Sequence, residues 1–220
     1  MSWRNGRPRM WRLLASSATA IGLMLVLLTP TLANAATVQV DKPNASLTAK
    51  WWRKFVAIPD ANSLDRCDVG TRKILFLAGT TGGSATRSCT TDKDIFLVPL
   101  INVECSTAED PLLTTFPQLR KCAKDFADDF TDLQLVVDGR EVSNLNSLRV
   151  QAKGTFTSVE DNVFNIPPAE KSKFASDGYW ALIKLTPGEH TLTFGGSYVP
   201  VPGEPALFTT EVTYHLLVKN

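Results

Sequence analysis

The sequence predicts a mainly β domain, either an antiparallel β-sandwich or a jelly-roll-like fold, with about two packed helices and disulfide crosslinks. Three observations predict this class. Apolar residues alternate with a period of two through much of the second half of the chain, and turn-forming dipeptides separate the apolar runs. Four cysteines stand between residues 67 and 122.

Residues 1–35 have the pattern of a cleavable export signal. A basic start precedes an apolar run from Ala20 to Leu28, which is shorter than the roughly 20 residues of a membrane-spanning helix. Pro30 and the small-residue stretch Ala33-Asn34-Ala35 follow. We therefore expect cleavage near Ala35, a single domain at 36–220 without a membrane span, and a secreted or periplasmic protein of bacterial type; an uncleaved anchor is the alternative.

Composition argues against a polyanionic partner. Removing the four arginines of residues 1–35 leaves 19 basic and 22 acidic residues, a net charge of −3. The remaining chain has no basic stripe interleaved with aromatic residues, so we expect no nucleic acid to bind. It also lacks a phosphate-binding loop and the paired Cys or His spacings of a zinc site, so we expect no cofactor and no metal.

An even number of cysteines in an exported protein predicts disulfide bonds. Three connectivities are open for the four residues. We favour the sequential pairing of Cys67 with Cys89 and of Cys105 with Cys122, because each bond closes a loop of about twenty residues, worth roughly 3 kcal/mol.

Two segments have helical periodicity. The first follows Asn44, carries Trp51 and Trp52 among apolar residues between 47 and 58, and stops at Pro59. The second runs over 117–130, where Cys122 lies on its apolar face. We expect the tryptophans to fill core space and Cys122 to tie the second helix to the strand that carries Cys105.

Strands are predicted at 73–78 and 95–103, with a glycine-rich turn at 79–83 between the first of them and the next strand. Pro99 indicates an edge strand or a bulge. Asn102 and Glu104 continue the face of Phe96 in simple alternation. Polar groups on a core face need partners, so we expect these two residues to cap the disulfide loop or to line a pocket.

The second half is predicted to be β throughout, except for a long polar loop over 158–178. Asp138-Gly139 follows an alternating run at 133–137 and predicts a hairpin. Pro187-Gly188 predicts a second turn that pairs the run at 179–185 with the run at 190–195. Matching apolar residues in the last two runs places Leu192 opposite Tyr214 and Phe194 opposite Val212.

This register predicts a binding face. It leaves Trp180 on a polar face near Glu211, with Lys184 and His215 on the same set of strands, and an aromatic ring among hydroxyl and charged groups suits a sugar. The alternative is that a neighbouring element covers Trp180. His190 and His215 are expected on opposite faces, which argues against a shared metal ion.

We therefore predict a non-catalytic binding module for a glycan or another envelope component, such as an envelope protein, rather than an enzyme. One alternative is a hydrolase that uses Glu104 in a cleft with Asn102 and Arg87, because a carboxyl group in a partly apolar site has a raised pKa and can donate a proton. The other is a structural or interaction protein of the envelope, which needs no site.

Several strings resemble a family of uncharacterised exported bacterial proteins. The resemblance covers most of residues 36–220 and implies export and a single domain, but no activity. The strings are Trp51-Trp52, Phe76-Leu77-Ala78-Gly79-Thr80 with Gly82-Gly83, Ile101-Asn102-Val103-Glu104-Cys105-Ser106, Asp177-Gly178-Tyr179-Trp180, and Pro187-Gly188-Glu189-His190-Thr191 with Phe194-Gly195-Gly196.

Overall fold

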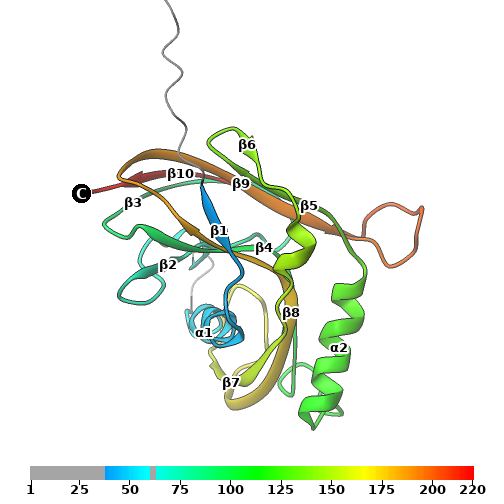
Figure 1. Cartoon of the computed structure of the whole chain (residues 1–220). Helices are drawn as coiled ribbons and strands as arrows, with labels where there is room; N and C mark the ends of the chain where they lie inside the picture. Colours follow the sequence, from blue (N-terminus) through cyan, green and yellow to red (C-terminus); the bar gives the residue numbers. More distant parts are fainter. Residues whose placement is uncertain (1–37, 60–62) are drawn as a thin grey trace, which may run out of the picture. The chain divides into compact units, whose positions relative to one another are not determined.

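Two five-stranded sheets pack face to face in the computed structural model, which describes residues 38–59 and 63–220 (Figure 1). Sheet A has the order β1-β8-β4-β2, with β7 also beside β8, and consists of β1 (Gln39–Asp41), β2 (Ile74–Phe76), β4 (Ile95–Ser106), β7 (Ala152–Ser158) and β8 (Ala169–Lys184). Sheet B has the order β3-β10-β9-β5-β6 and consists of β3 (Gly83–Thr91), β5 (Phe130–Val137), β6 (Arg140–Glu141), β9 (Gly188–Tyr198) and β10 (Phe208–Val218). The predicted mainly β class with two packed sheets is confirmed.

Most strand pairs are antiparallel, but β2 with β4 and β3 with β10 are parallel. The described residues make one compact unit. The predicted export signal at 1–35 lies outside the described residues.

Side chains from both sheets form the core between them. Alternate residues of β10 point into it, and Val212, Tyr214 and Leu216 are all almost completely buried. Phe194 of β9 stacks on Tyr214 with ring centroids 6.0 Å apart. The period-two pattern of the sequence therefore corresponds to one buried and one exposed face of sheet B.

A second core lies on the opposite face of sheet A, under helix α1 (Ala45–Phe55) (Figure 1). Asn44 caps the helix, since its side-chain oxygen accepts a hydrogen bond from the backbone N–H of Leu47 at 3.0 Å. Trp51, Trp52 and Phe55 face the sheet and are buried. The prediction that this stripe fills core space is confirmed, and sheet A is covered on both faces.

Helix α2 (Phe116–Asp128) is joined to sheet A by a disulfide bond. Cys122 on the helix is bonded to Cys105 near the end of β4, and Cys67 is bonded to Cys89 of β3. Both predicted pairings are therefore confirmed. Short 3-10 turns at η1 (Ser63–Asp65) and η2 (Leu145–Leu148) complete the elements.

A β-bulge in β4 changes which side chains face α1. The β4–β8 register shifts between Pro99 and Ile101, so the extra residue reverses the alternation beyond it. As a result, Asn102 and Glu104 lie on the face toward α1 and not on the face of Phe96. Our prediction of a bulge at Pro99 is confirmed, and our prediction that the two polar residues continue the Phe96 face is wrong.

Of the two strand pairings predicted near the end of the sequence, one is confirmed and one is wrong. Leu192 pairs with Tyr214 and Phe194 pairs with Val212 between β9 and β10. The turn at Pro187-Gly188, however, joins strands of different sheets. Leu185 donates its backbone N–H to the backbone carbonyl of Asp94 at 2.9 Å and so stays beside sheet A, which makes the predicted hairpin between 179–185 and 190–195 wrong.

The predicted long loop at 158–178 is much shorter. Strand β8 begins at Ala169, and its first half pairs with β7 on one side and the end of β4 on the other. Polar residues here occupy exposed strand positions, as Lys171 and Lys173 do, while Phe174 is buried. Only residues 159–168 form an irregular segment between the two strands.

Candidate functional site

Trp180 does not form an exposed platform for a sugar. It lies on β8 of sheet A, whereas the predicted neighbour Glu211 lies on β10 of sheet B. Its side chain has an exposed fraction of 0%. The indole packs edge-on against Trp51 with ring centroids 5.4 Å apart. A ring without an exposed face cannot stack on a ligand, so the predicted placement of Trp180 is wrong and the alternative of a covered Trp180 holds.

The other three predicted binding residues are exposed but do not converge. Lys184 ends β8, and its side-chain nitrogen lies 3.6 Å from a carboxylate oxygen of Asp94. Glu211 and His215 lie on the outer face of sheet B, where His215 pairs with Thr191 of β9. The predicted set is thus divided between the two sheets.

The residues of the alternative catalytic set are also separated. Arg87 lies on β3 of sheet B, where its guanidinium donates to Asp65 at 2.7 Å and to the carbonyl of Ala78 at 3.0 Å. Glu104 and Asn102 lie on β4 of sheet A. Arg87 therefore anchors η1 to the end of β2 and does not face Glu104.

Glu104 is a buried carboxyl group without a hydrogen bond from any described residue. Burial, followed by the neighbouring carboxyl group of Glu109, holds the pKa of Glu104 well above its ordinary value of 4.5. The hydroxyl of Ser176, at the paired position on β8, is also buried without a hydrogen bond to the described residues. Glu104 thus has the raised pKa expected of a general acid, but it does not line the cavity beside Asn102.

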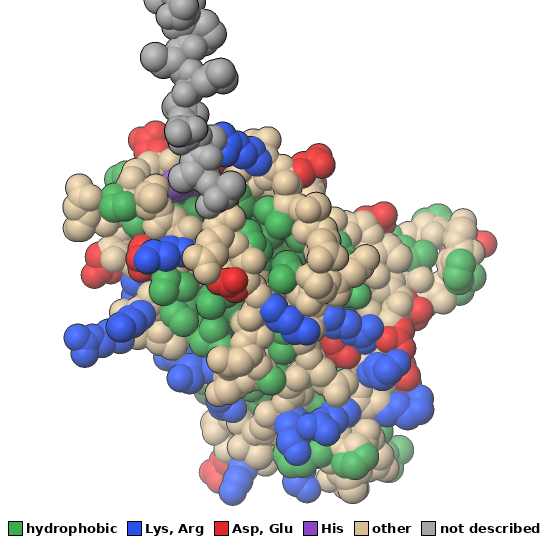
Figure 2. Space-filling model, viewed as in Figure 1, with side chains coloured by type: hydrophobic (Ala, Val, Ile, Leu, Met, Phe, Trp, Pro, Cys, Tyr) green, Lys and Arg blue, Asp and Glu red, His purple; other side chains and the backbone are tan. Residues whose placement is uncertain are grey.

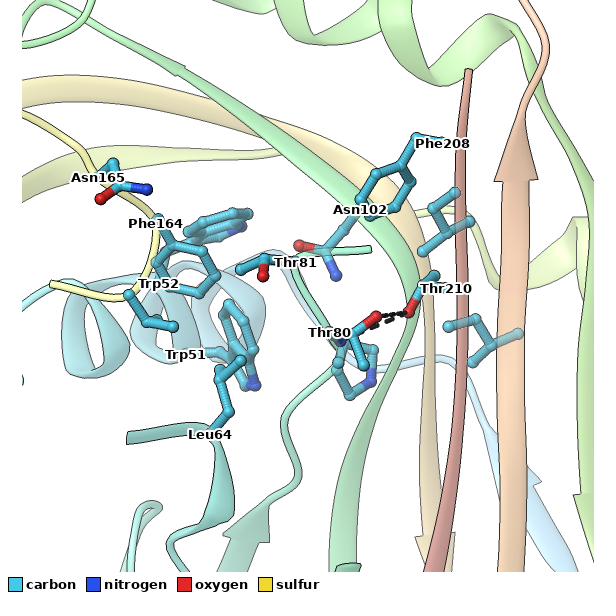
Figure 3. Close-up of a pocket in the computed structure, with 15 residues that line it drawn as sticks. Trp51, Trp52, Leu64, Thr80, Thr81, Asn102, Phe164, Asn165, Phe208 and Thr210 are labelled. Atoms are coloured by element: carbon cyan, nitrogen blue, oxygen red, sulfur yellow. Dashed lines mark hydrogen bonds between the residues drawn. The ribbon is translucent and has the colours of Figure 1, made fainter. Parts of the chain in front are cut away.

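A cavity lies beside Asn102. Its volume is about 360 Å³, within the roughly 300–1,000 Å³ of typical small-molecule pockets. Six parts of the chain meet there: helix α1, η1, the glycine-rich turn at 79–83, strand β4, the irregular segment at 159–168, and the start of β10. We call it the α1 cavity, and Figure 3 shows its 15 lining residues. They are Trp51, Trp52, Leu64, Gly79, Thr80, Thr81, Pro99, Leu100, Ile101, Asn102, Val163, Phe164, Asn165, Phe208 and Thr210.

One wall of the α1 cavity is aromatic. Phe164 lies with its ring centroid 5.2 Å from that of Trp52 and 5.9 Å from that of Trp51, and the three rings stand together in Figure 3. The Trp51 N–H donates to the carbonyl of Leu77 at 2.7 Å, which fixes this ring against sheet A. Phe164 is only partly buried, so the wall offers a ring surface to the cavity.

Asn162 holds the segment that carries Phe164. Its buried side-chain amide donates to the carbonyls of Val159 and Ile166, both at 2.7 Å, and its oxygen accepts the N–H of Ile166 at 3.2 Å. The segment is thus folded around one asparagine before any ligand arrives. This arrangement reduces the ordering cost of binding.

The opposite wall is polar and uncharged. Asn102 and Thr81 lie across from the aromatic rings in Figure 3, and the hydroxyls of Thr80 and Thr210 lie 2.9 Å apart. The side-chain amide of Asn102 makes no hydrogen bond to the described residues. None of the described lining residues carries a charge. Neutral hydrogen-bonding groups therefore face a ring surface across the cavity.

Sequence reasoning placed one of these residues at a pocket, since Asn102 was expected either there or at the disulfide loop. It assigned Trp51 and Trp52 to the core, where they are, but did not predict that their edges also line a cavity. The sequence signal for Phe164 and Asn165 is their position in a polar loop that contains Pro167 and Pro168. The loop predicted over 158–178 is longer than the observed segment at 159–168.

Comparisons with family models, curated proteins and solved structures gave no match. The fold and the cavity define the class, a disulfide-bonded two-sheet β protein with a pocket beside helix α1 whose described lining residues are uncharged. Of the helices in residues 38–59 and 63–220, none has the length and apolar character needed to cross a membrane. In the same residues no three His, Cys, Asp or Glu side chains are grouped to bind one metal ion.

The surface seen in Figure 2 carries charges of both signs. Lys and Arg side chains are interspersed with Asp and Glu side chains, and apolar groups show between them. A mixed surface does not attract one sign of partner over a distance. The chemistry of a ligand is therefore better judged from the cavity than from the surface charge.

Proposed function

We propose that this protein works outside the cytoplasm as a non-catalytic binding module for an uncharged glycan, and that the α1 cavity is its binding site. The disulfide bonds support an oxidising compartment. The observation that carries the ligand class is the pairing, in one cavity, of a partly exposed aromatic ring with free neutral amide and hydroxyl groups.

A pyranose ring has the matching chemistry. Its C–H groups form an apolar face that packs on an aromatic ring, and its hydroxyls form a rim that donates and accepts hydrogen bonds. Phe164 supplies the ring, while Asn102, Asn165 and Thr81 supply the polar contacts. A charged ligand would lose its hydration without gaining a counter-charge from the described lining residues, so the site favours a neutral one.

The described residues that line the cavity include no carboxyl, imidazole or thiol group, which supports binding over turnover. Glu104 is the residue with a raised pKa on this side of sheet A, but it is closed to solvent and not among the lining residues. General acid catalysis needs the acid within hydrogen-bond reach of the leaving group. A hydrolase role for Glu104 therefore has less support than binding.

The test is a glycan array followed by calorimetry on the purified protein. We expect neutral oligosaccharides to bind and Phe164→Ala to lose most of that binding, because the side chain that forms the apolar wall is removed. Phe126→Ala is the matched control, since Phe126 is a partly exposed phenylalanine on α2. If no glycan binds, or if Phe164→Ala binds as the wild type does, the proposal is wrong.

A further inference from the structure

The imidazole ring of His190 is held between two hydrogen-bond acceptors. Its Nδ1 lies 2.8 Å from Oδ2 of Asp138, in the turn that follows β5. Its Nε2 lies 2.8 Å from the backbone carbonyl oxygen of Thr186, in the connection between β8 and β9. The side chain of His190 is only 12% exposed. One ring therefore joins a turn of sheet B to the connection that carries the chain from sheet A to sheet B.

The two bonds together require a hydrogen on each ring nitrogen. A backbone carbonyl only accepts, so Nε2 must donate to Thr186. Oδ1 of Asp138 already accepts the backbone N–H of Thr191 at 2.8 Å, as a carboxylate does. Imidazole is a stronger base than carboxylate, so the proton between Nδ1 and Oδ2 resides on the ring. A neutral imidazole has only one N–H, and the observed arrangement is therefore that of the imidazolium ion.

Loss of one proton breaks one particular bond. Histidine is the side chain that ordinarily changes its charge between pH 5 and pH 8. The bond to Asp138 is the stronger of the two, because its acceptor is charged. A neutral ring therefore keeps its hydrogen on Nδ1 and turns a lone pair on Nε2 toward the carbonyl oxygen of Thr186. Two acceptors repel each other, so the bond that is lost is the one to the connection.

The connection is attached to the core between the sheets. Leu185 precedes Thr186 and is 3% exposed, and Val137 precedes Asp138 and is 1% exposed. Asp138 is held independently of the ring, because its backbone N–H donates to the carbonyl of Thr191 at 2.8 Å. Releasing Thr186 thus loosens the chain where it passes from sheet A to sheet B and leaves the turn after β5 in place.

We infer that His190 is a pH-sensitive latch. The protonated ring fastens the β8–β9 connection to the turn between β5 and β6, and the neutral ring releases the connection while it stays bonded to Asp138. The latch is thus closed at acidic pH and opens as the pH rises. Among the described residues, Asp138 is the ionisable side chain bonded to the ring. The other charged or titratable side chains on the neighbouring strands and turns are Glu189, His215, Lys219, Arg140, Glu141, Asp94 and Lys184.

Nitrogen-15 NMR of the imidazole ring tests the protonation states directly. The chain has two histidines, so His215→Gln leaves His190 as the only source of ring signals. We expect a hydrogen on both ring nitrogens at pH 5 and on Nδ1 alone at pH 8. A ring with one hydrogen at pH 5, or with its hydrogen on Nε2 at pH 8, would overturn the latch.

Amide hydrogen exchange tests whether the connection opens. Protection factors correct the exchange rate for its intrinsic pH dependence, and those of Gly188 to His190 should fall about three- to tenfold from pH 5 to pH 8, as the loss of one hydrogen bond does. Protection in β10 should not change in parallel. The comparison is repeated in Glu104→Gln, because Glu104 also makes global stability depend on pH. The local change should persist in that variant.

Three variants assign the effect to the ring. His190→Gln has no proton to lose in this range, so its protection factors should not depend on pH. Asp138→Asn removes the negative charge beside the ring, so release should occur at a lower pH than in the wild type. Glu189→Gln is the matched control, since Glu189 is an exposed carboxyl group next to His190 in the chain, and it should release at nearly the wild-type pH. Constant protection in the wild type, or the same fall in His190→Gln, would contradict the inference.

Discussion

The indole of Trp180 meets the indole of Trp51 edge-on, with ring centroids 5.4 Å apart and an angle of 74° between the planes. One ring comes from the centre of sheet A and the other from α1, so this contact joins the helix to the sheet. Edge-to-face geometry is favourable for aromatic pairs beyond the area that they bury. Trp180, which the sequence suggested as a platform for a ligand, therefore holds α1 against sheet A.

Trp180→Ala should destabilise the fold severely. The substitution empties a completely buried position beneath α1, and aromatic-to-alanine changes in cores cost about 3–5 kcal/mol. Urea unfolding followed by circular dichroism measures the change in unfolding free energy. A loss below about 1 kcal/mol would mean that the ring does not fill the space under the helix.

Glu104→Gln should stabilise the protein at neutral pH and reduce the pH dependence of its stability. The folded state raises the pKa of Glu104 and so holds the proton more tightly than the unfolded state does. Stability from this group is fully present below about pH 4.5 and is lost as the pH rises through the folded-state pKa. Glutamine carries no charge, so the variant does not incur this loss.

Thermal melts of wild type and Glu104→Gln from pH 4 to pH 8 measure the difference. The two melting temperatures should approach each other at the acidic end and separate as the pH rises. Glu109→Gln is the control for the contribution of the neighbouring carboxyl group to the raised pKa of Glu104. Because burial contributes more than Glu109 does, this variant should flatten the wild-type profile only in part. Parallel wild-type and Glu104→Gln profiles would contradict the raised pKa.

Arg149→Ala should strongly destabilise the fold, because it leaves the buried carboxylate of Asp177 without its ion-pair partner. Arg149 makes two hydrogen bonds of 2.9 Å to Asp177, whose side chain is only 3% exposed. Removing one partner of a buried ion pair typically costs 3–5 kcal/mol. Asp128→Asn is the control, because Asp128 contacts the same arginine from an exposed position and should cost less than about 1 kcal/mol.

Chemical denaturation of these two variants checks the difference, and the double variant Arg149→Met with Asp177→Asn should recover part of the loss. If Arg149→Ala and Asp128→Asn have similar effects, the ion pair with Asp177 does not bear on stability.

Replacing Cys105 and Cys122 together by alanine should loosen α2 more than the rest of the chain. The disulfide closes a loop with a sequence separation of 17, which corresponds to about 3 kcal/mol in the loop-entropy model. Amide hydrogen exchange should show faster exchange over residues 116–128 than over β9 and β10. The same replacement of Cys67 and Cys89 should instead affect β3 and the segment that follows η1, which that bond joins.

The sequence predicted those parts of the fold that depend on local or simple alternating patterns. Asn44 begins α1 as expected, Asp138-Gly139 makes the turn after β5 with both residues at positive φ, and the apolar match of Leu192 with Tyr214 gives the true register. In each case the residues that carry the signal are also the residues in contact.

The parts that failed depend on which sheet a strand joins. Nothing local to Pro187-Gly188 distinguishes a hairpin from a turn between sheets, because both need the same backbone bend. The bulge at Leu100 reverses a face without changing the composition of the strand, so alternation put Asn102 on the wrong side. The α1 cavity followed from neither pattern, since it requires α1, the 159–168 segment and the turn at 79–83 to meet.

The parallel pairing of β3 with β10 has a consequence for how the chain reaches this structure. Phe208–Val218 is the last strand, and it lies between Gly83–Thr91 and Gly188–Tyr198 in sheet B. A chain released from its N-terminus onward therefore holds β3 without its sheet partner in the described structure until Phe208–Val218 is free. Pairing between segments so far apart in sequence is slow to form, so completion of sheet B is a late, length-dependent event. A chain truncated before Phe208 leaves β3 and one edge of β9 open to pairing with other chains.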